Sequence, residues 1–340
     1  MEKKYTFKDF KSDQQVRWCP GCGDHAVLTS LQRSLPSVAE AADLSIEKFV
    51  VVSGIGCSSR LPYYMATYGF HGIHGRATAL ATGVKVANPS LSVWQPCGDG
   101  DALAIGGNHF IHAIRRNIDL NIILFNNRIY GLTKRQYSPT SKFGAITKTS
   151  PYGTVENPFE PGSLVLGAKG TFFARSLDVM LPLNEEIMVA AAAHKGTSVM
   201  EMLTNCVIFN DGTHKDISDP AVREDRTIVL HHGQKMIFGK NKDKGLVRSG
   251  MGLKVVTIGQ DGYTEDDILT HDAHCQDLGL QMLLAEMKDP DFPVALGIIR
   301  DVQAPTYDEG VAKQVEDVKK TSKIQCVDDL LRSGSTWEVK

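Results

Sequence analysis

The sequence lacks the features that would place it with nucleic-acid-binding, membrane or secreted proteins. Its formal net charge is only −2, so we expect no polyanionic partner and no nucleic acid. No stretch approaches the ~18 consecutive apolar residues of a membrane-spanning helix, so we expect no membrane association. The N-terminus also has no apolar core of the signal-peptide type. We therefore predict a cytoplasmic protein.

Cysteine is scarce, and internal repeats and low-complexity tracts are absent. Seven cysteines among 340 residues are an odd number for a disulfide framework. In a chain expected in the cytoplasm, metal binding or redox use of cysteine is favoured instead. The length and a hydrophobic content of 42% allow a large core in one large domain or two.

One segment has the pattern of a strand, an acidic glycine turn, a helix and a second strand. An apolar run over Leu91–Cys97 leads into the turn Gly98–Asp101. Residues 102–116 carry apolar side chains at helical spacing. A second strand-like run, Leu120–Phe125, ends at the pair Asn126-Asn127. This order predicts a β-α-β unit with parallel strands.

Parallel strands of such a unit end at the same edge of the sheet, where open α/β sheets bind their ligands. Asp99 and Asn127 offer the hard oxygens that Mg²⁺ prefers, and Mg²⁺ often completes its shell with phosphate. Gly98 and Gly100 let the backbone approach a phosphate, and the following helix N-terminus favours negative charge. The segment predicts a magnesium-diphosphate site; the alternative is an ordinary turn with a helix-capping Asp.

Four cysteines are placed where they could share a site. Cys19 and Cys22 are separated by Pro and Gly, which bend the backbone so that both sulfurs can face one metal. Cys57 follows a predicted strand over 48–52, and Cys206 follows another, so both are expected at the same edge as the acidic turn. The pattern leaves zinc, an iron–sulfur cluster and dithiol redox chemistry open.

The expected organisation is α/β, with a doubly wound, mostly parallel sheet and helices on both faces over residues 17–215. Residues 1–16 form an N-terminal arm. The long loop 139–165 is expected to be functional or an interface. Residues 216–340 form a C-terminal appendage of hairpins and helices that lies against a partner chain. The predicted hairpins join 227–231 to 235–238 and 245–248 to 253–258, and the predicted helices span 265–284 and 314–319.

The motifs resemble those of a known family. The acidic turn followed by the Asn pair resembles the motif of thiamine diphosphate-dependent enzymes. WCPGCG, GIGCSSR, HGRA, GDGD, NNRIYGLTKRQYSPTS and HHGQKMIFGKNKDKG together resemble the beta subunit of 2-oxoacid:ferredoxin oxidoreductases. WCPGCG together with YGLTKRQYSPTS is similar to the 2-oxoglutarate branch rather than the pyruvate branch.

The resemblance implies the thiamine diphosphate-binding fold and assigns site residues by motif. Mg²⁺ would be held by Asp99, Asn127 and the backbone carbonyl of Ile129, and a 4Fe–4S cluster by Cys19, Cys22, Cys57 and Cys206. The implied thiamine contacts are Ile55, Gly56, Cys57, Ser58, Gly100, Asp101, Gly131 and Leu132. Arg60 and His74 are the candidate catalytic residues. Members of the group often carry Lys where Arg60 stands, so a forked guanidinium replaces a point charge there.

The implied reaction is oxidative decarboxylation of 2-oxoglutarate with coenzyme A to succinyl-CoA, CO₂ and reduced ferredoxin, or the reverse carboxylation. The implied partner is an alpha subunit, which supplies the carboxylate that activates thiamine; the alpha-beta pair is expected to be doubled by symmetry. One alternative is the same chemistry on pyruvate or another 2-oxoacid. Alternatives of other classes are a non-redox thiamine-dependent decarboxylase with structural zinc, and a non-catalytic scaffold that only relays electrons.

Overall fold

An eight-stranded sheet forms the centre of the fold in the computed structural model, which describes residues 4–339. Its strands are β1 (Phe49–Ser53), β2 (Tyr68–His71), β3 (Ser92–Gly98), β4 (Leu120–Asn126), β5 (Phe172–Leu177), β6 (Thr197–Leu203), β7 (Thr227–Leu230) and β11 (Val294–Asp301). Their order across the sheet is β2-β1-β3-β4-β6-β5-β11-β7. Only the pairing of β11 with β5 is antiparallel among them. The predicted mostly parallel sheet is confirmed.

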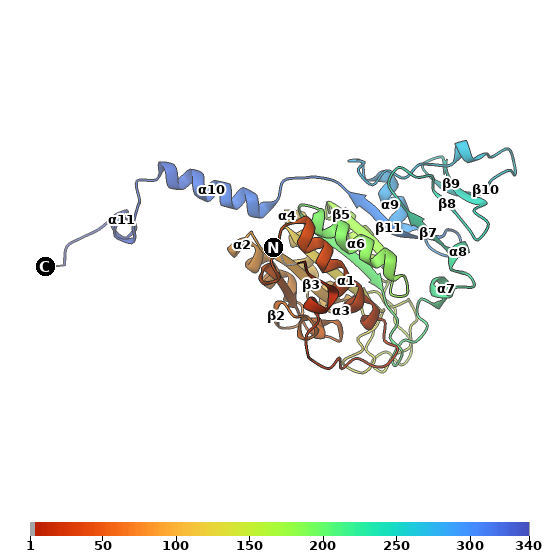
Figure 1. Cartoon of the computed structure of the whole chain (residues 1–340), viewed down its shortest axis with the longest axis horizontal. Coiled ribbons are helices and arrows are strands. Elements are labelled where there is room, and N and C mark those ends of the chain that lie inside the picture. The colour runs from red at the N-terminus through yellow and green to blue at the C-terminus, as the bar shows by residue number, and fades with distance from the viewer. Residues whose placement is uncertain (1–3, 340) are drawn as a thin grey trace.

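Helices cover both faces of this sheet (Figure 1). The helices α1 (Asp24–Ala41) and α6 (Leu181–Ala193) pack together on one face. The other face is covered by α2 (Ala77–Ala87), α4 (Gly107–Arg116), α5 (Pro161–Gly167) and α9 (Gly279–Glu286). Side chains alternate along each strand, so Val50 and Val52 enter one core cluster while Phe49 and Val51 enter the other.

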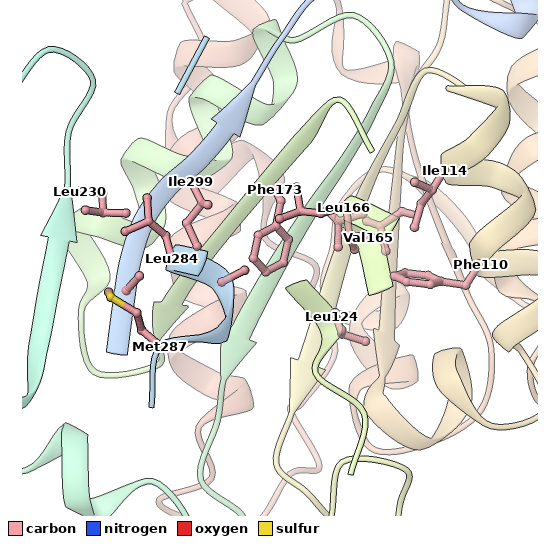
Figure 2. Close-up of a cluster of buried hydrophobic side chains, with 14 of the residues drawn as sticks. Phe110, Ile114, Leu124, Val165, Leu166, Phe173, Leu230, Leu284, Met287 and Ile299 are labelled. Atoms are coloured by element: carbon pink, nitrogen blue, oxygen red, sulfur yellow. The ribbon is translucent and has the colours of Figure 1, made fainter. Parts of the chain in front are cut away.

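Figure 2 shows the core on the α4 side of the sheet. Side chains from α4, α5 and α9 pack there on those of the strands beneath them and are buried. The labelled residues are Phe110, Ile114, Leu124, Val165, Leu166, Phe173, Leu230, Leu284, Met287 and Ile299. This core includes side chains from every strand between β1 and β7 in the order of the sheet, so it fixes the positions of the strand ends that carry the site.

The helix predicted over residues 102–116 is interrupted. Helix α3 (Asp99–Leu103) starts directly at the predicted turn, and α4 begins only at Gly107. The chain folds back between them so closely that a Cβ at Gly106 would lie 2.4 Å from the backbone oxygen of Asp101. Only glycine permits this approach, and the helical spacing of the apolar side chains gives no sign of the break.

The C-terminal region differs from the expected pattern. The predicted 227–238 hairpin is wrong, because β7 pairs with β11 in the central sheet while β8 (Ile237–Phe238) pairs with β9 (Lys244–Ser249). The second hairpin is confirmed as β9 and β10 (Gly252–Thr257), which with β8 form a separate three-stranded sheet. The domain division after residue 215 stays a prediction, although two strands of the later region lie in the central sheet.

The helix predicted over 265–284 is also wrong. This segment begins with a short 3-10 turn (Glu265–Asp267), continues as loop up to residue 278 and becomes helical only in α9 over its last six residues. The predicted helix 314–319 lies within α10 (Tyr307–Thr321). Helix α10 and α11 (Val327–Arg332) extend away from the body of the molecule (Figure 1). Across residues 4–339, no helix has both the length and the hydrophobicity to cross a bilayer.

The described part of the predicted N-terminal arm packs on the chain's own core; residues 1–3 of that arm lie outside the described residues. Its 3-10 turn (Phe7–Phe10) buries Phe10 completely, with the Phe10 and Phe49 ring centroids 5.4 Å apart. Short helices occupy other connections, namely the 3-10 helices at Ile46–Lys48 and Ser58–Tyr64, α7 (Lys215–Ser218) and α8 (Arg223–Arg226).

Candidate functional site

A cavity of about 690 Å³ lies at the carboxyl ends of β1, β3 and β4. Gly98 pairs with Phe125 across β3 and β4, so the acidic segment and the Asn pair lie beside each other, as predicted. Most of the predicted site residues line this cavity: Ile55, Gly56, Cys57, Ser58, His74, Asp99, Gly100, Asn127, Ile129, Gly131 and Leu132. The others lie outside its lining: Asp101, Arg60, Cys19, Cys22 and Cys206.

Asp99 is a buried carboxyl group in the wall of this cavity. It is 2% exposed at the start of α3, and its Oδ2 accepts hydrogen bonds from Ser138 Oγ (2.6 Å) and Thr140 Oγ1 (2.5 Å). Burial raises the pKa of Asp99 to about 6, although the hydroxyls of Ser138 and Thr140 act in the opposite direction. A cation at the cavity would favour the ionised carboxylate, so the position suits a metal ligand.

The loop after β4 brings further polar groups to the same wall. Asn127 Oδ1 accepts a 3.2 Å hydrogen bond from the Ile129 amide, and Arg128 between them has a φ of +57°. The Tyr130 hydroxyl donates to the backbone oxygen of Gly100 at 2.7 Å. A Cβ at Gly100 would lie 2.3 Å from the Tyr130 ring, so only glycine fits there. The loop is thereby held against the acidic segment.

Asp101 connects the loops around the cavity. Its Oδ1 accepts hydrogen bonds from the backbone amides of Ile55 (3.2 Å) and Gly75 (2.8 Å) and lies 2.6 Å from His74 Nδ1. Its Oδ2 faces Gly54, where a Cβ would lie only 2.1 Å away. These contacts position His74 at the cavity, while the predicted contact of Asp101 with a cofactor stays a prediction.

The segments that carry the four cysteines meet beside the cavity. A Cβ at Gly131, in the cavity wall, would lie 3.5 Å from Cys206 Sγ and 3.7 Å from Cys57 Sγ. The Cys19–Cys22 turn closes through a 3.1 Å hydrogen bond from the Cys22 amide to the Cys19 carbonyl oxygen.

Two further hydrogen bonds join these segments. The Trp18 indole donates to the Cys57 carbonyl oxygen at 2.7 Å. The Gly23 amide donates to the Asn205 carbonyl oxygen at 3.1 Å. The cysteines thus come from three separate parts of the chain, as predicted.

Burial favours the neutral form of two of the four thiols. Burial, together with nearby Asp24, raises the pKa of Cys57 to about 12 and raises the pKa of Cys22 well above its ordinary value. Only a cationic centre would hold these sulfurs as thiolates at neutral pH.

The arrangement of the thiols also bears on the kind of metal. Among residues 4–339, no three Cys, His, Asp or Glu side chains are placed to bind one metal ion, as a structural zinc site requires. In a 4Fe–4S cluster each iron takes one protein thiolate, so the sulfurs need not converge on one point.

Asp24 was missed by the sequence interpretation. It follows the Cys19–Cys22 motif directly, lines the cavity and is 1% exposed. Burial raises the pKa of Asp24 to about 7 against a hydrogen bond from Cys22, and the charges of Asp178 and Asp99 raise it further. Acidic residues are common in the first turn of a helix, so its position in sequence carried no signal.

The cavity wall also contains polar atoms that suit a polar ligand. Asp24 Oδ1 and Ser58 Oγ are buried without a hydrogen-bond partner among the described residues. Such orphaned atoms at a cavity wall fit a polar ligand, as thiamine diphosphate is. The size of the cavity and the oxygen donors Asp99 and Asn127 fit the same group with its magnesium.

Arg60 lies beside the main cavity. It belongs to the 3-10 helix Ser58–Tyr64 and lines a neighbouring recess of about 370 Å³. Ile55, Gly56 and Leu132 line both spaces. Arg60 could therefore meet a group that extends out of the main cavity, while direct contact with the cofactor stays a prediction.

Comparison with known proteins gives the family. Residues 54–202 match the family model of the C-terminal TPP-binding domain of thiamine pyrophosphate enzymes. The chain is 47% identical over 335 residues to 2-oxoglutarate oxidoreductase subunit KorB of Mycobacterium tuberculosis, covering 98% of this chain and 88% of that protein. It is 48% identical over 189 residues to 2-oxoglutarate synthase subunit KorB of Archaeoglobus fulgidus, covering 56% of this chain and 69% of that protein.

The structural comparison agrees. A solved structure of 2-oxoglutarate:ferredoxin oxidoreductase from Magnetococcus marinus, with 2-oxoglutarate, coenzyme A and succinyl-CoA bound, superposes with a TM-score of 0.76 and 30% identity. The match covers 98% of this chain and 97% of that one. The chain contains a thiamine diphosphate-binding domain. It belongs to the family of 2-oxoacid oxidoreductase beta subunits that includes KorB, which confirms the assignment made from the motifs.

Proposed function

We propose that the chain is the beta subunit of a 2-oxoglutarate:ferredoxin oxidoreductase. Together with an alpha subunit it converts 2-oxoglutarate and coenzyme A to succinyl-CoA and CO₂ and reduces ferredoxin, or runs the reverse carboxylation. The observation that carries the proposal is the adjacency of Cys57 and Cys206 to Gly131, in the wall of the thiamine cavity. The identity to KorB over almost the whole chain supports 2-oxoglutarate as the substrate.

The proposed cofactors are thiamine diphosphate, Mg²⁺ and a 4Fe–4S cluster. Thiamine diphosphate supplies an electron sink for the carbanion that decarboxylation leaves. Asp99, Asn127 and the Ile129 carbonyl would hold Mg²⁺, and Cys19, Cys22, Cys57 and Cys206 would hold the cluster. The residues proposed to contact thiamine are Ile55, Gly56, Cys57, Ser58, Gly100, Asp101, Gly131 and Leu132.

The protein residues have distinct tasks in this proposal. The Tyr130 hydroxyl keeps the loop after β4 against Gly100 and closes one wall of the cavity. Asp101 holds His74 at the cavity, where the His74 ring meets the Tyr130 ring edge-on at a centroid distance of 5.8 Å. Arg60, in the adjoining recess, offers a guanidinium to a carboxylate of the substrate. Cys57 lines the cofactor cavity, and its sulfur lies with that of Cys206 beside Gly131. Electrons therefore have a short path from the cofactor to the proposed cluster.

An alpha subunit is needed to complete the site. The subunit names of the relatives support such a partner, and the alpha-beta pair is proposed to be doubled by symmetry. The isolated chain should show no turnover, because the carboxylate that activates thiamine comes from the alpha subunit. Turnover by the isolated beta chain would contradict this part of the proposal.

One assay tests the function directly. The alpha-beta complex is given coenzyme A and a low-potential electron acceptor, with either 2-oxoglutarate or pyruvate. We expect 2-oxoglutarate to be preferred, and a preference for pyruvate would favour the alternative substrate. Asp99→Ala should lower both thiamine diphosphate binding and turnover; unchanged turnover would place the chemistry elsewhere.

Metal analysis of anaerobically purified protein tests the cluster. We expect a brown sample that contains iron and sulfide, whereas a colourless zinc-containing sample would favour the non-redox decarboxylase. Cys206→Ser should abolish ferredoxin reduction. A Cys206→Ser complex that still reduces ferredoxin would remove this residue from the ligand set.

A further inference from the structure

Oδ2 of Asp99 accepts hydrogen bonds from two hydroxyl groups. Ser138 Oγ and Thr140 Oγ1 both donate to Oδ2, at 2.6 Å and 2.5 Å. A carboxylate oxygen has about two lone-pair sites, so two donors saturate it. Asp99 therefore retains only Oδ1 for a cation and can act as a monodentate ligand.

The two hydroxyl donors are held in place by buried neighbours. Ser138 and Thr140 are 2% and 3% exposed. The Ser138 amide donates to Ser141 Oγ at 2.8 Å, and Ser141 Oγ donates to the Arg128 carbonyl oxygen at 2.7 Å. Ser138 is thus fixed to the same loop that carries the proposed magnesium ligands Asn127 and Ile129.

Thr140 is fixed from the opposite side by strand residues. Its oxygen also lies 2.9 Å from Asn126 Oδ1, so the single hydroxyl proton that it gives to Asp99 lies between two acceptors. The Asn126 amide donates to Glu201 Oε1 at 2.7 Å, and Glu201 Oε2 pairs with Arg175 Nε at 2.7 Å. All three partners are buried, Asn126 at the end of β4 and Glu201 and Arg175 within β6 and β5, so the Thr140 side chain is fixed beside Asp99.

Single-oxygen coordination by Asp99 has a consequence for the choice of metal. Mg²⁺ needs a compact octahedral shell and commonly binds one oxygen of a carboxylate. Ca²⁺ takes six to eight oxygens, and carboxylates bind it through one or both of their oxygens. Blocking one oxygen of the carboxylate therefore removes the two-oxygen binding mode that Ca²⁺ can use. It leaves the single-oxygen mode that Mg²⁺ uses.

We propose that Ser138 and Thr140 are positioning residues that make the thiamine diphosphate site selective for Mg²⁺ over Ca²⁺ by blocking Oδ2 of Asp99. The inference depends on the proposed magnesium site and goes beyond it, because neither residue contacts the metal. Outer partners of metal ligands commonly change metal affinity by about 10- to 100-fold when they are removed.

The test measures binding rather than turnover. The alpha-beta complex is freed of metal and thiamine diphosphate, and thiamine diphosphate is titrated by calorimetry at fixed concentrations of Mg²⁺ or Ca²⁺. In Thr140→Val we expect the Mg²⁺-dependent affinity to fall about 10-fold and the Ca²⁺-to-Mg²⁺ affinity ratio to rise by at least a similar factor. Thr140→Ser keeps the hydroxyl and should restore the ratio of the natural protein.

Two further variants complete the design. Ser138→Ala removes the other donor and should shift the ratio in the same direction, which keeps the test valid if Thr140→Val fails to assemble. Thr154→Val is the matched control, because Thr154 is 6% exposed in the same loop and donates to the Lys142 carbonyl oxygen, not to Asp99. It should leave the ratio unchanged.

The outcomes separate this inference from the proposed function. If the unmodified complex binds no thiamine diphosphate in a metal-dependent way, the magnesium site itself is wrong. If it binds with Mg²⁺ preferred and both Thr140→Val and Ser138→Ala keep that ratio, the inference is overturned. An equal change in Thr154→Val would also overturn it, because general loosening of the loop would then explain the effect.

Discussion

Asp101 Oδ1 lies 2.6 Å from His74 Nδ1 and also accepts hydrogen bonds from the backbone amides of Ile55 and Gly75. One buried carboxylate oxygen therefore joins the loop after β1, the loop before α2 and the start of α3. This relationship explains how segments far apart in sequence form one cavity wall.

Asp101→Ala should destabilise the chain strongly. Its removal leaves buried donors without an acceptor, and we expect the free energy of unfolding to fall by about 3 kcal/mol. His74→Ala removes one half-exposed donor and should cost about 1 kcal/mol. Denaturant unfolding of the two variants measures both values, and a smaller loss in Asp101→Ala than in His74→Ala would contradict the assigned role.

Gly100→Ala should be poorly tolerated because its Cβ would lie 2.3 Å from the Tyr130 ring. We expect a loss of about 2 kcal/mol in the free energy of unfolding, since such overpacking typically costs 1–3 kcal/mol. Gly98→Ala is the matched control: its φ is −79° and the new Cβ would lie 3.5 Å from Ser58 Oγ, an ordinary contact. Equal thermal stability of the two variants would refute this packing argument.

Trp18→Phe tests the link between the Cys19–Cys22 turn and the Cys57 loop. The variant keeps an aromatic ring near Tyr64 and loses the 2.7 Å hydrogen bond from the indole to the Cys57 carbonyl oxygen. If the proposed cluster is present, we expect its visible absorbance to decay about three- to tenfold faster in air, since a lost hydrogen bond of ~1 kcal/mol eases local opening. An unchanged decay rate would show that this contact does not protect the cluster.

His214 should make stability depend on pH. Burial, assisted by the positive charges of Arg128 and Lys142, lowers the pKa of His214 to about 3 from its ordinary 6.5. Below the ordinary pKa the unfolded chain takes up a proton that the folded chain does not, so stability is lost as the pH falls. Between about pH 7.5 and about pH 5.5 the loss from this residue is about 1.4 kcal/mol.

The variant His214→Gln isolates this contribution. A Gln amide can still donate to the Asn126 carbonyl oxygen, which the His214 ring contacts at 3.0 Å, and it has no titrating group. The pH-dependent loss in the natural chain should exceed that in the variant by the stated amount. Parallel stability curves for the two proteins across this pH range would disprove the assignment.

The sequence was sufficient for features set by local pattern. The predicted strands Leu91–Cys97 and Leu120–Phe125 match β3 and β4 to within one residue at each end. It was insufficient where local pattern and packing disagree. The runs that form β7 and β8 alternate like a hairpin, yet β7 pairs with β11, which lies far along the chain and buries Ile228 and Leu230.

The candidate site was likewise predicted only in part from the sequence. Motif spacing was enough to bring Asp99 and Asn127 to one edge of the sheet, because strand order and direction follow from a β-α-β unit. Ser138 and Thr140 lay in a segment identified only as a long polar loop, and nothing local indicated that their hydroxyls meet Asp99. The burial of Asp24 was likewise invisible in the order of residues.

The sequence by itself determined the family, the strands on either side of the acidic turn, and which strand ends carry oxygen and sulfur donors, because these depend on near neighbours in the chain. Only the tertiary structure decided that β11 and β7 complete the sheet, that Asp101 joins the loops and that two hydroxyls occupy one oxygen of Asp99. Those contacts join residues distant in sequence, and the packing of both cores, rather than any local period, brings them within hydrogen-bonding distance.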